Sequence, residues 1–389
     1  MFKPFLKWPG GKSEEINHIQ PYCPKSKIRY YVEPFLGGGA FFLSLSSKDY
    51  QAAYLNDFSK ELIALYEYIR KQDASFYSYL DEIWQFWNIC SKVFENEMSN
   101  FTKIYQTINT QTPTLSNEID RIIDKVQIEF LKNKPSFLNQ YFNDVSLISF
   151  LKKSIFQKMT NMKRKESKDG QLPISDYQDN FESGIKTSIY TIYRNLYNQL
   201  NQTYLKSSHA KPNTLQVALF YYLREFCYSS MFRYNSSGDF NVPYGGISYN
   251  QKKFDEKINY TKNKNLQACL SQAHFYAEDF ETFLNTIALN QDDFIFLDPP
   301  YDSEFSTYAN QNFDQSHQIR LANYLINQCK AKFMVVIKHT DFIENLYSNH
   351  PNIYLHGFDK DYRVSFMNRN DKKVQHLLIV NYQVGLEKV

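Results

Sequence analysis

One short stretch of the chain combines a carboxylate, a stiff backbone and an aromatic ring: Asp298-Pro299-Pro300-Tyr301. It follows the apolar run 294–297, which is typical of a buried strand. Proline has no N–H group and a fixed φ, so two consecutive prolines make the loop stiff. Such a loop can direct the Asp298 carboxylate and the Pro299 carbonyl at one point. The motif suits a planar ring that carries an amino group. The two acceptors would hold the amino group, and the ring would stack on Tyr301.

The exocyclic amine of adenine is a group of this kind, because its nitrogen carries two protons and is only weakly nucleophilic. Hydrogen bonds from this amine to Asp298 and to the Pro299 carbonyl would draw the nitrogen toward tetrahedral geometry and free its lone pair. Cytosine N4 in DNA, adenine in RNA and glutamine in a protein are chemically compatible with the same loop. A proline-stiffened turn without a chemical role is the plain structural alternative.

A glycine segment follows a β-prone run near the start of the chain. Residues 30–33 favour a strand, and Glu33-Pro34-Phe35-Leu36-Gly37-Gly38-Gly39 leads from it into the apolar stretch 40–45. Glycines after a strand allow a cofactor to approach the backbone closely. The dinucleotide motif G-x-G-x-x-G would need a glycine where Phe42 stands, so this is not that motif.

An acidic residue, Asp57, lies about 20 residues beyond the glycine segment, after a second β-prone run at 52–55. An acidic side chain at this place can hydrogen-bond to ribose hydroxyls. S-adenosylmethionine carries a ribose and no phosphate, which fits an acidic site. The alternative role for Asp57 is to cap the next helix, although Ser59 could do so instead.

The N-terminal stretch Lys7-Trp8-Pro9-Gly10-Gly11-Lys12-Ser13 superficially resembles a phosphate-binding loop. The motif G-x-x-x-x-G-K-[ST] would require glycine where Leu6 stands, so the stretch does not predict a nucleoside triphosphate site.

Five segments, in this order along the chain, resemble the Dam-type (D12 class) DNA adenine-N6 methyltransferases. They are Phe5 to Lys12, Glu33 to Gly39, Asn56-Asp57, Arg233 to Pro243, and Asp298 to Tyr301. The resemblance covers about residues 1–75 and 216–382. It implies a site-specific enzyme that methylates N6 of adenine in double-stranded DNA with S-adenosylmethionine, without a metal, after flipping the base out of the duplex. The rival to this enzyme is a DNA-binding subunit that has lost activity.

The resemblance also implies roles for individual residues. The catalytic motif would be Asp298, Pro299, Pro300 and Tyr301. The cofactor would be bound by Trp8, Lys12, Phe35, Gly37, Gly38, Gly39, Asp57, Asp279 and Asp298. DNA would be contacted by Lys7, Arg233, Tyr234, Asn235, Ser236, Asn241 and Tyr244.

The elements that must position these residues alternate between strands and helices, which favours a mostly parallel sheet. Strand-like runs stand at 30–33, 52–55, 273–277, 294–297, 333–337 and 377–381, and helical patterns at 40–45, 60–70, 216–231, 319–329 and 342–347. We expect an α/β fold: a Rossmann-like S-adenosylmethionine-dependent methyltransferase sheet, with an inserted, mainly helical target-recognition domain and a β-hairpin.

The expected domains are a catalytic domain, 1–75 and 260–389, and a target-recognition region, 76–259, with a hairpin at 232–245. The helical stretch 76–215 is about 100 residues longer than a compact member of the family needs, so the recognition sequence stays open. It contains a basic cluster: Lys152, Lys153, Lys158, Lys163, Arg164, Lys165 and Lys168. A solvated helix face and a phosphate-binding surface are the two interpretations of this cluster.

Composition limits the classes of function and the cellular compartments that fit the chain. The 389 residues carry a net charge of +3, which permits nucleic-acid binding without favouring it. The 17% of aromatic residues is high, and for any single ring core packing is favoured over base stacking. The five cysteines show no C-x-x-C spacing, which indicates reduced thiols and a cytoplasmic protein. We see no signal peptide and no membrane span. We expect a monomer whose partners are double-stranded DNA and, within a restriction–modification system, a cognate restriction endonuclease.

Overall fold

The computed structural model describes residues 2–8, 10–107, 112–205, 211–300, 313–361 and 373–384. The chain divides into two compact units. The first, the sheet unit, comprises Met1–Lys71 and Thr261–Val389, and the second, the helical unit, comprises Gln72–Tyr260. These boundaries lie within a few residues of the expected ones at 75 and 260.

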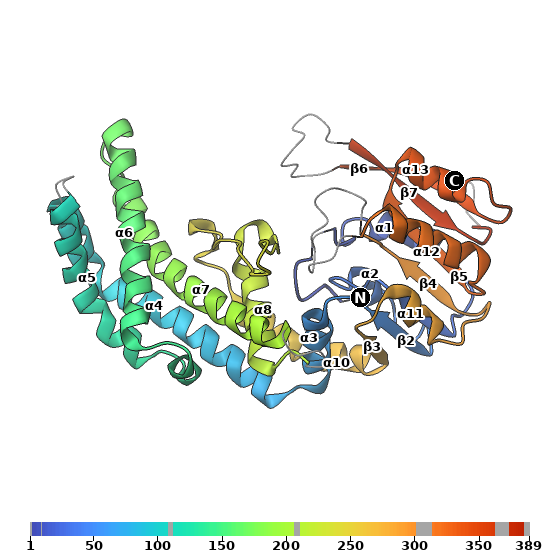
Figure 1. Cartoon of the computed structure of the whole chain (residues 1–389), viewed down its shortest axis with the longest axis horizontal. Coiled ribbons are helices and arrows are strands. Elements are labelled where there is room, and N and C mark those ends of the chain that lie inside the picture. Colours follow the sequence, from blue (N-terminus) through green and yellow to red (C-terminus); the bar gives the residue numbers. More distant parts are fainter. Residues whose placement is uncertain are drawn as a thin grey trace. The chain divides into compact units, whose positions relative to one another are not determined.

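The sheet unit is built around seven strands in the order β3-β2-β1-β4-β5-β7-β6 (Figure 1). Their bounds are β1 Tyr30–Glu33, β2 Ala52–Asn56, β3 Ala273–Tyr276, β4 Phe294–Leu297, β5 Lys332–Lys338, β6 Tyr354–Asp361 and β7 Lys373–Val380. β3, β2, β1, β4 and β5 are mutually parallel, whereas β7 runs antiparallel to both β5 and β6. The direction of progression along the sheet reverses between β1 and β4, and ligands of such sheets bind at that reversal, beyond the carboxyl ends of the strands.

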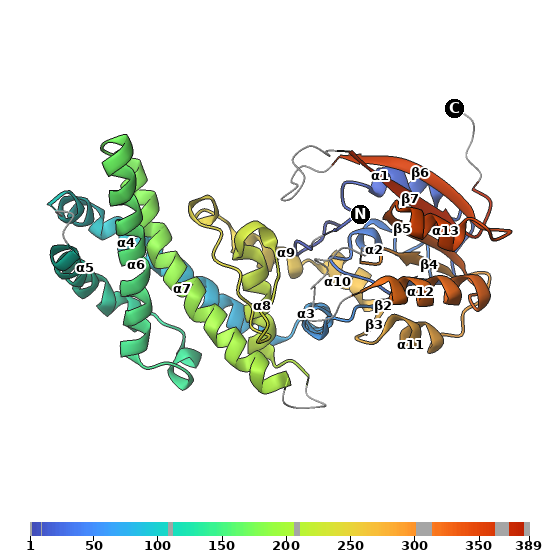
Figure 2. The same ribbon diagram turned by 45° about the horizontal axis from the view of Figure 1, so that its top comes forward.

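Helices cover both faces of this sheet (Figure 2). They are α1 Ile16–Ile19, α2 Ala40–Ser44, α3 Lys60–Lys71, α10 Lys264–Ser271, α11 Phe280–Asn285, α12 Gln315–Asn327 and α13 Asp341–Tyr347. α11, α12 and α13 share a core with one set of alternate strand residues, among them Val32 and Ile295. On the other face α2 packs on the strands, with Phe41 stacked on Phe296 at 3.9 Å between ring centroids. All four residues of β4 are buried, which explains their continuous apolar run.

The helical unit contains α4 Ala74–Thr107, α5 Thr112–Lys132, α6 Asp144–Asp169, α7 Ile174–Leu205, α8 Thr214–Phe226 and α9 Phe254–Thr261. The helical content expected for 76–215 is therefore observed. Aromatic rings fill its interior: Trp87 packs against Tyr222, Phe226 and Tyr244 with ring centroids 4.6 to 5.6 Å apart. Much of the high aromatic content thus serves packing.

Three local expectations differ from the structure. The helix expected over 216–231 ends at Phe226, because the backbone at 226–228 hydrogen-bonds to residues 243–245 instead of continuing the helix. The hairpin expected over 232–245 consists of a turn closed by one isolated bridge, Tyr234↔Phe240, without extended strands. Side chains of α7 bond to its carbonyl groups and replace a partner strand. β6 was not expected; its sequence contains glycine and charged residues, which an edge strand tolerates.

Candidate active site

The loops that follow β1, β2 and β3 are joined by the buried side chain of Asn56, the last residue of β2. Its amide nitrogen donates to the Pro34 carbonyl at 3.0 Å and to the Glu278 carbonyl at 3.1 Å. Its amide oxygen accepts from the Glu278 N–H at 2.9 Å. One side chain therefore fixes the loops after β1 and β3 on either side of Asp57.

Asp57 connects the glycine segment to the start of α3. Its carboxylate accepts from the Gly37 N–H and from the Ser59 N–H, each at 2.9 Å. Ser59 caps α3, since its hydroxyl accepts from the Leu62 N–H at 3.3 Å. The helix-capping alternative for Asp57 is therefore taken by Ser59. A carboxylate has about four acceptor sites, more than the two that these N–H groups use.

The glycine segment is crowded by the protein's own aromatic side chains. A Cβ added to Gly37 would lie 2.8 Å from Trp8 Cδ1, and one added to Gly39 would lie 2.5 Å from the Tyr66 hydroxyl oxygen. Both glycines have positive φ, +50° and +63°. Steric space for Trp8 and Tyr66 thus explains the glycines directly, in addition to the expected approach of a cofactor.

Asp298 follows β4 and meets Lys12 from the N-terminal segment. Lys12 Nζ lies 2.7 Å from Asp298 Oδ1, with side chains 2% and 19% exposed, respectively. A buried ammonium group requires such a partner, because desolvation without one is strongly unfavourable. The pair fixes one oxygen of the carboxylate at the carboxyl end of β4.

Behind Lys12 lie two further buried ionisable residues that the sequence did not reveal. Lys12 Nζ is 3.9 Å from Glu15 Oε2, and that oxygen is 3.8 Å from His376 Nδ1 on β7. Glu15 and His376 are both buried. The expected catalytic carboxylate is therefore the outermost member of a row of alternating acidic and basic groups. Lys12–Glu15 follows from i, i+3 spacing, but nothing local connects either residue with His376.

A further acid, Glu33 at the end of β1, is buried beneath this site. Desolvation raises the pKa of its carboxyl well above the ordinary value, and the nearby Asp298 and Asp57 charges add to the effect. The Tyr31 hydroxyl donates to Glu33 Oε2 at 2.6 Å, which acts in the opposite direction. Within the described residues the site thus contains one ammonium group and four carboxyl groups, a balance that suits a cationic, phosphate-free ligand. The carboxyl groups are those of Glu15, Glu33, Asp57 and Asp298.

The proline loop is held by α12. Gln318, a buried residue of that helix, donates its amide to the Pro300 carbonyl at 3.0 Å. Pro299 is buried and Asp298 partly exposed, as a carboxylate aimed out of a stiff loop requires. The expected stacking residue Tyr301 lies outside the described residues.

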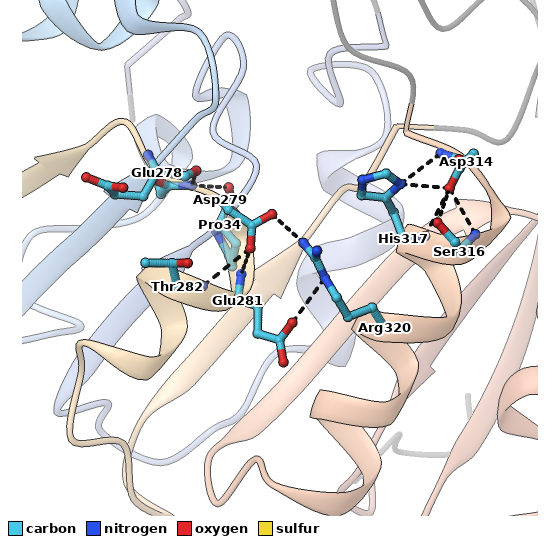
Figure 3. A network of polar contacts seen from close by, with 10 residues as sticks. Pro34, Glu278, Asp279, Glu281, Thr282, Asp314, Ser316, His317 and Arg320 are labelled. Carbon is cyan, nitrogen blue, oxygen red and sulfur yellow. Dashed lines mark hydrogen bonds and ion pairs between the residues drawn. The ribbon is translucent and has the colours of Figure 1, made fainter. Parts of the chain in front are cut away.

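Asp279 has structural partners for both of its carboxylate oxygens (Figure 3). Oδ1 accepts from the Glu281 N–H at 3.0 Å and caps α11, while Oδ2 pairs with Arg320 of α12. Arg320 Nε also lies 3.0 Å from Glu281 Oε2. Beside this network, Phe35 packs against Phe280, with ring centroids 5.6 Å apart. The structure therefore explains Asp279 without a ligand.

The residues expected to contact DNA fall into three environments. Lys7, in the sheet unit, is exposed. In the helical unit, Arg233, Asn235, Ser236 and Asn241 are exposed, and Asn235 Oδ1 accepts from the N–H groups of Ser237 and Asp239 to shape the turn. Tyr234 is half-buried and shares a 2.8 Å hydrogen bond with the Tyr197 hydroxyl. Tyr244 is buried, and its hydroxyl donates to Asn250 Oδ1.

One face of α7 supports the 232–245 loop. Four side chains spaced by four residues bond to it: Tyr190, Arg194, Asn198 and Gln202. Asn198 makes a matched pair of bonds with the Phe240 backbone, donating to its carbonyl at 3.1 Å and accepting from its N–H at 2.9 Å. The exposed tip is therefore held on a rigid helix.

A metal site and a membrane-spanning helix each have structural requirements that the described residues do not meet. In the described ranges, no group of three or more His, Cys, Asp or Glu side chains could hold a metal ion. None of the described helices is both long and apolar enough to cross a bilayer.

Comparison with known proteins identifies the family. Residues 8–360 match the model of the D12 class N6 adenine-specific DNA methyltransferases. The chain is 24% identical over 385 residues to the Type II methyltransferase M.CviBI of Paramecium bursaria Chlorella virus NC1A, covering 98% of this chain and 100% of that protein. It is 24% identical over 399 residues to the Type II methyltransferase M.MjaIII of Methanocaldococcus jannaschii, covering 98% and 99%.

A third relative is the Retron Ec67 DNA adenine methylase of Escherichia coli, 28% identical over 209 residues, which cover 53% of this chain and 68% of that protein. The seven-stranded mixed sheet is consistent with a methyltransferase fold. Because the family match spans nearly the whole chain, this protein belongs to the D12 class N6 adenine-specific DNA methyltransferases.

Proposed function

We propose that the chain transfers a methyl group from S-adenosylmethionine to N6 of an adenine within a fixed sequence of double-stranded DNA. The sheet unit carries the chemistry and the helical unit selects the target. The observation that carries this proposal is the Lys12–Asp298 pair at the carboxyl end of β4, beside the Asp57-bound glycine segment. The family to which the chain belongs is specific for N6 of adenine in DNA.

The acidic character of the site fits S-adenosylmethionine. Asp57, Glu33 and Asp298 offer carboxyl groups, and Asp57 would accept hydrogen bonds from the ribose hydroxyls. Trp8, Phe35, Gly37 and Gly39 would border the cofactor, and Lys12 would act through Asp298. Asp279 would act only by fixing α11 and α12, given its bonds to Arg320. The bound cofactor supplies an activated methyl group on a sulfonium centre.

Asp298 and the Pro299 carbonyl would accept hydrogen bonds from the two N6–H groups of adenine and orient the nitrogen lone pair toward the methyl group. Lys12 holds Asp298 in place from behind, and Gln318 holds the loop through the Pro300 carbonyl. Much of the rate enhancement would come from proximity and alignment. Stacking of the base on Tyr301 remains a prediction.

Adenine in a duplex is stacked and base-paired and exposes N6 only on its major-groove edge, so the base must leave the stack to bring N6 to Asp298. Flipping costs a few kcal/mol, which contacts in the pocket and along the DNA offset. We assign the exposed Arg233, Asn235, Ser236 and Asn241, supported by α7, to DNA contact, together with Lys7. Tyr234 and Tyr244 would shape the loop from within.

Mass analysis of nucleosides tests the reaction itself. Purified protein is incubated with duplex DNA and S-adenosylmethionine bearing a labelled methyl group, and the DNA is digested to nucleosides. Label in N6-methyladenosine is expected. Label only in N4-methylcytosine, or only in RNA or protein offered in parallel, contradicts the assignment of the substrate. A rise in 2-aminopurine fluorescence at the target position, dependent on the protein, tests base flipping.

The type II methyltransferases among the relatives favour a restriction–modification setting for this chain as well. We propose that it acts as a monomer and protects DNA from an endonuclease that cuts the same sequence. DNA methylated by the protein should resist that endonuclease and unmethylated DNA should not. Sedimentation of the protein at working concentration as a dimer would contradict the monomer.

A further inference from the structure

The helix α6 carries an unusual concentration of positive charge. Its 26 residues include seven basic and three acidic side chains, and no acidic residue lies between 145 and 165. The neighbouring helices differ: α5 has three basic and four acidic residues, and α7 has two basic and three acidic ones. The excess is therefore specific to α6 among these three helices.

The buried residues of α6 show which face of the helix packs against the bundle and which face is exposed. Five apolar residues face the bundle: Leu147, Leu151, Ile155, Met159 and Met162. Lys158 lies toward α7, where its Cγ is 3.5 Å from a Cβ that would be added at Gly184, and burial lowers its pKa. The remaining basic residues lie at the margins of the helix or on its outer face.

The basic residues at the margins have acidic partners. Lys152 lies 2.7 Å from Asp120, Lys163 lies 3.3 Å from Glu166, and Lys165 lies 3.9 Å from Asp176. Their charges are therefore largely satisfied within the bundle. The outer three, Lys153, Arg164 and Lys168, form no ion pair with any residue in the described part of the chain, and all three are exposed.

These three cations share one stripe with neutral hydrogen-bonding side chains. Helical spacing of 3.6 residues places Lys153, Gln157, Arg164 and Lys168 along one line, flanked by Thr160 and Asn161. Gln157 Nε2 bonds to Asn161 Oδ1 at 3.1 Å, which orders the amides between the charges. At 1.5 Å per residue the stripe from 153 to 168 is about 22 Å long, the length of about six or seven base pairs.

We propose that this stripe of α6 binds the phosphate backbone of duplex DNA outside the recognition sequence. The proposal rests on the proposed function and gives the long helical segment a role in it. Exposed cations that pair with no described acidic residue, separated by neutral donors, match a row of phosphates. α6 and the 232–245 loop belong to the same unit, and both pack against α7.

The test compares two triple variants in the full chain. Lys153→Gln with Arg164→Gln and Lys168→Gln removes the stripe, and glutamine preserves helix propensity. The matched control removes three exposed charges of the sheet unit that lie just before strands, at the amino ends of the sheet: Lys25→Gln, Lys48→Gln and Lys330→Gln. Binding to a duplex longer than the target is measured between about 50 and 200 mM salt, and thermal melting checks folding.

Each phosphate contact contributes about 0.9 to the slope of log affinity against log salt, so loss of three lowers the slope by about 2.7. Over this salt range the wild type should lose about 40-fold more affinity than the stripe variant. Target and non-target duplexes should be affected alike, because phosphate contacts carry no sequence information. The control variant should behave as the wild type, and Lys153→Arg with Lys168→Arg should retain the wild-type slope.

Three results would overturn the proposal. If wild-type protein methylates DNA but the stripe and control variants show the same slope, α6 does not bind phosphates and the proposed function stands. The proposal fails in the same way if the stripe variant loses affinity for anionic lipid vesicles while its DNA binding is unchanged. If the wild type neither binds nor methylates duplex DNA, the proposed function fails and the DNA-binding role of the stripe falls with it.

Discussion

Both units contain buried ion pairs, but the polar groups of their proposed sites differ in exposure. In the sheet unit the ionisable groups near the strand ends are buried or half-buried and lie close to one another, as Lys12, Asp298 and Glu15 do. In the helical unit the polar groups of α7 bond to the backbone of the 232–245 loop and leave its tip exposed, while α6 exposes cations. Buried, mutually oriented groups suit bond-making chemistry, whereas exposed groups on rigid supports suit binding of a large polyanion.

This contrast predicts that substitutions in the two units will affect different observables. Changes at the strand ends should alter catalysis or cofactor affinity and leave DNA binding intact. Changes in the helical unit should alter DNA affinity or sequence discrimination and leave cofactor affinity intact.

The largest effect is expected for Asp298→Ala. It removes the acceptor proposed for the adenine amine, so methylation should fall by at least about 10²–10³-fold. DNA binding, measured by fluorescence anisotropy, should remain largely intact. Asp292→Ala, an exposed aspartate at the other end of β4, is the control and should keep full activity. An equal loss of binding and activity in Asp298→Ala would falsify its catalytic role.

Asp57→Ala should mainly weaken cofactor binding. Loss of a charged hydrogen-bond acceptor costs about 1.5–3 kcal/mol, which corresponds to a rise of about 10- to 100-fold in the dissociation constant of S-adenosylmethionine. Titration calorimetry measures this constant, and Asp57→Asn, which keeps one acceptor, should be intermediate. Asp49→Ala, at the opposite end of β2, should not change it. An unchanged constant in Asp57→Ala contradicts the ribose-binding role.

Asn198→Ala should reduce sequence discrimination. It removes both hydrogen bonds that hold the Phe240 backbone, so the tip of the 232–245 loop becomes less ordered. The ratio of methylation rates on the target and on a target with one altered base pair should fall by about tenfold. Gln199→Ala, the exposed next residue, serves as control. A slower reaction with the same ratio would show that the loop does not select the sequence.

The smallest effect is expected in how the stability of the Glu33→Gln variant depends on pH. Since burial raises the pKa of Glu33 in the folded protein, the unfolded chain releases this proton at a lower pH than the folded chain does. Wild-type stability should therefore decrease as the pH rises from about 4.3 toward the folded pKa. Glu33→Gln cannot ionise, and its amide oxygen can still accept from Tyr31. Its melting temperature relative to wild type should rise between about pH 5 and pH 8; a constant difference argues against a raised pKa.

Sequence patterns predicted most of the sheet unit because its key residues lie directly after apolar strands. Asp57 follows β2 and Asp298 follows β4, and the parallel sheet places their loops at one edge. Periodicity likewise predicted that 76–215 is mostly helical, although not the bounds of its helices. Such signals are local, and the rule for strand ends makes them sufficient.

The remaining features depend on contacts between residues far apart in the chain. The position of His376 near Glu15 requires β7 to pass the N-terminal segment, and Gln318 reaches Pro300 only through the packing of α12. The glycine motif gave no indication that Trp8 and Tyr66 occupy the space left by its missing side chains. Tyr244 and Tyr234 have the same residue type as surface base-stacking residues, and only the tertiary structure distinguishes them.

The central claim is that this chain methylates adenine N6 in a fixed DNA context. Single-molecule sequencing of DNA from a methylation-free bacterial host that expresses the chain tests it most directly, with Asp298→Ala as the matched control. We predict modified adenines in one sequence context with the wild type and none with the variant. Absence of modified adenines with the wild type, from a strain whose purified protein binds S-adenosylmethionine, would contradict the claim and direct attention to cytosine, RNA or protein substrates.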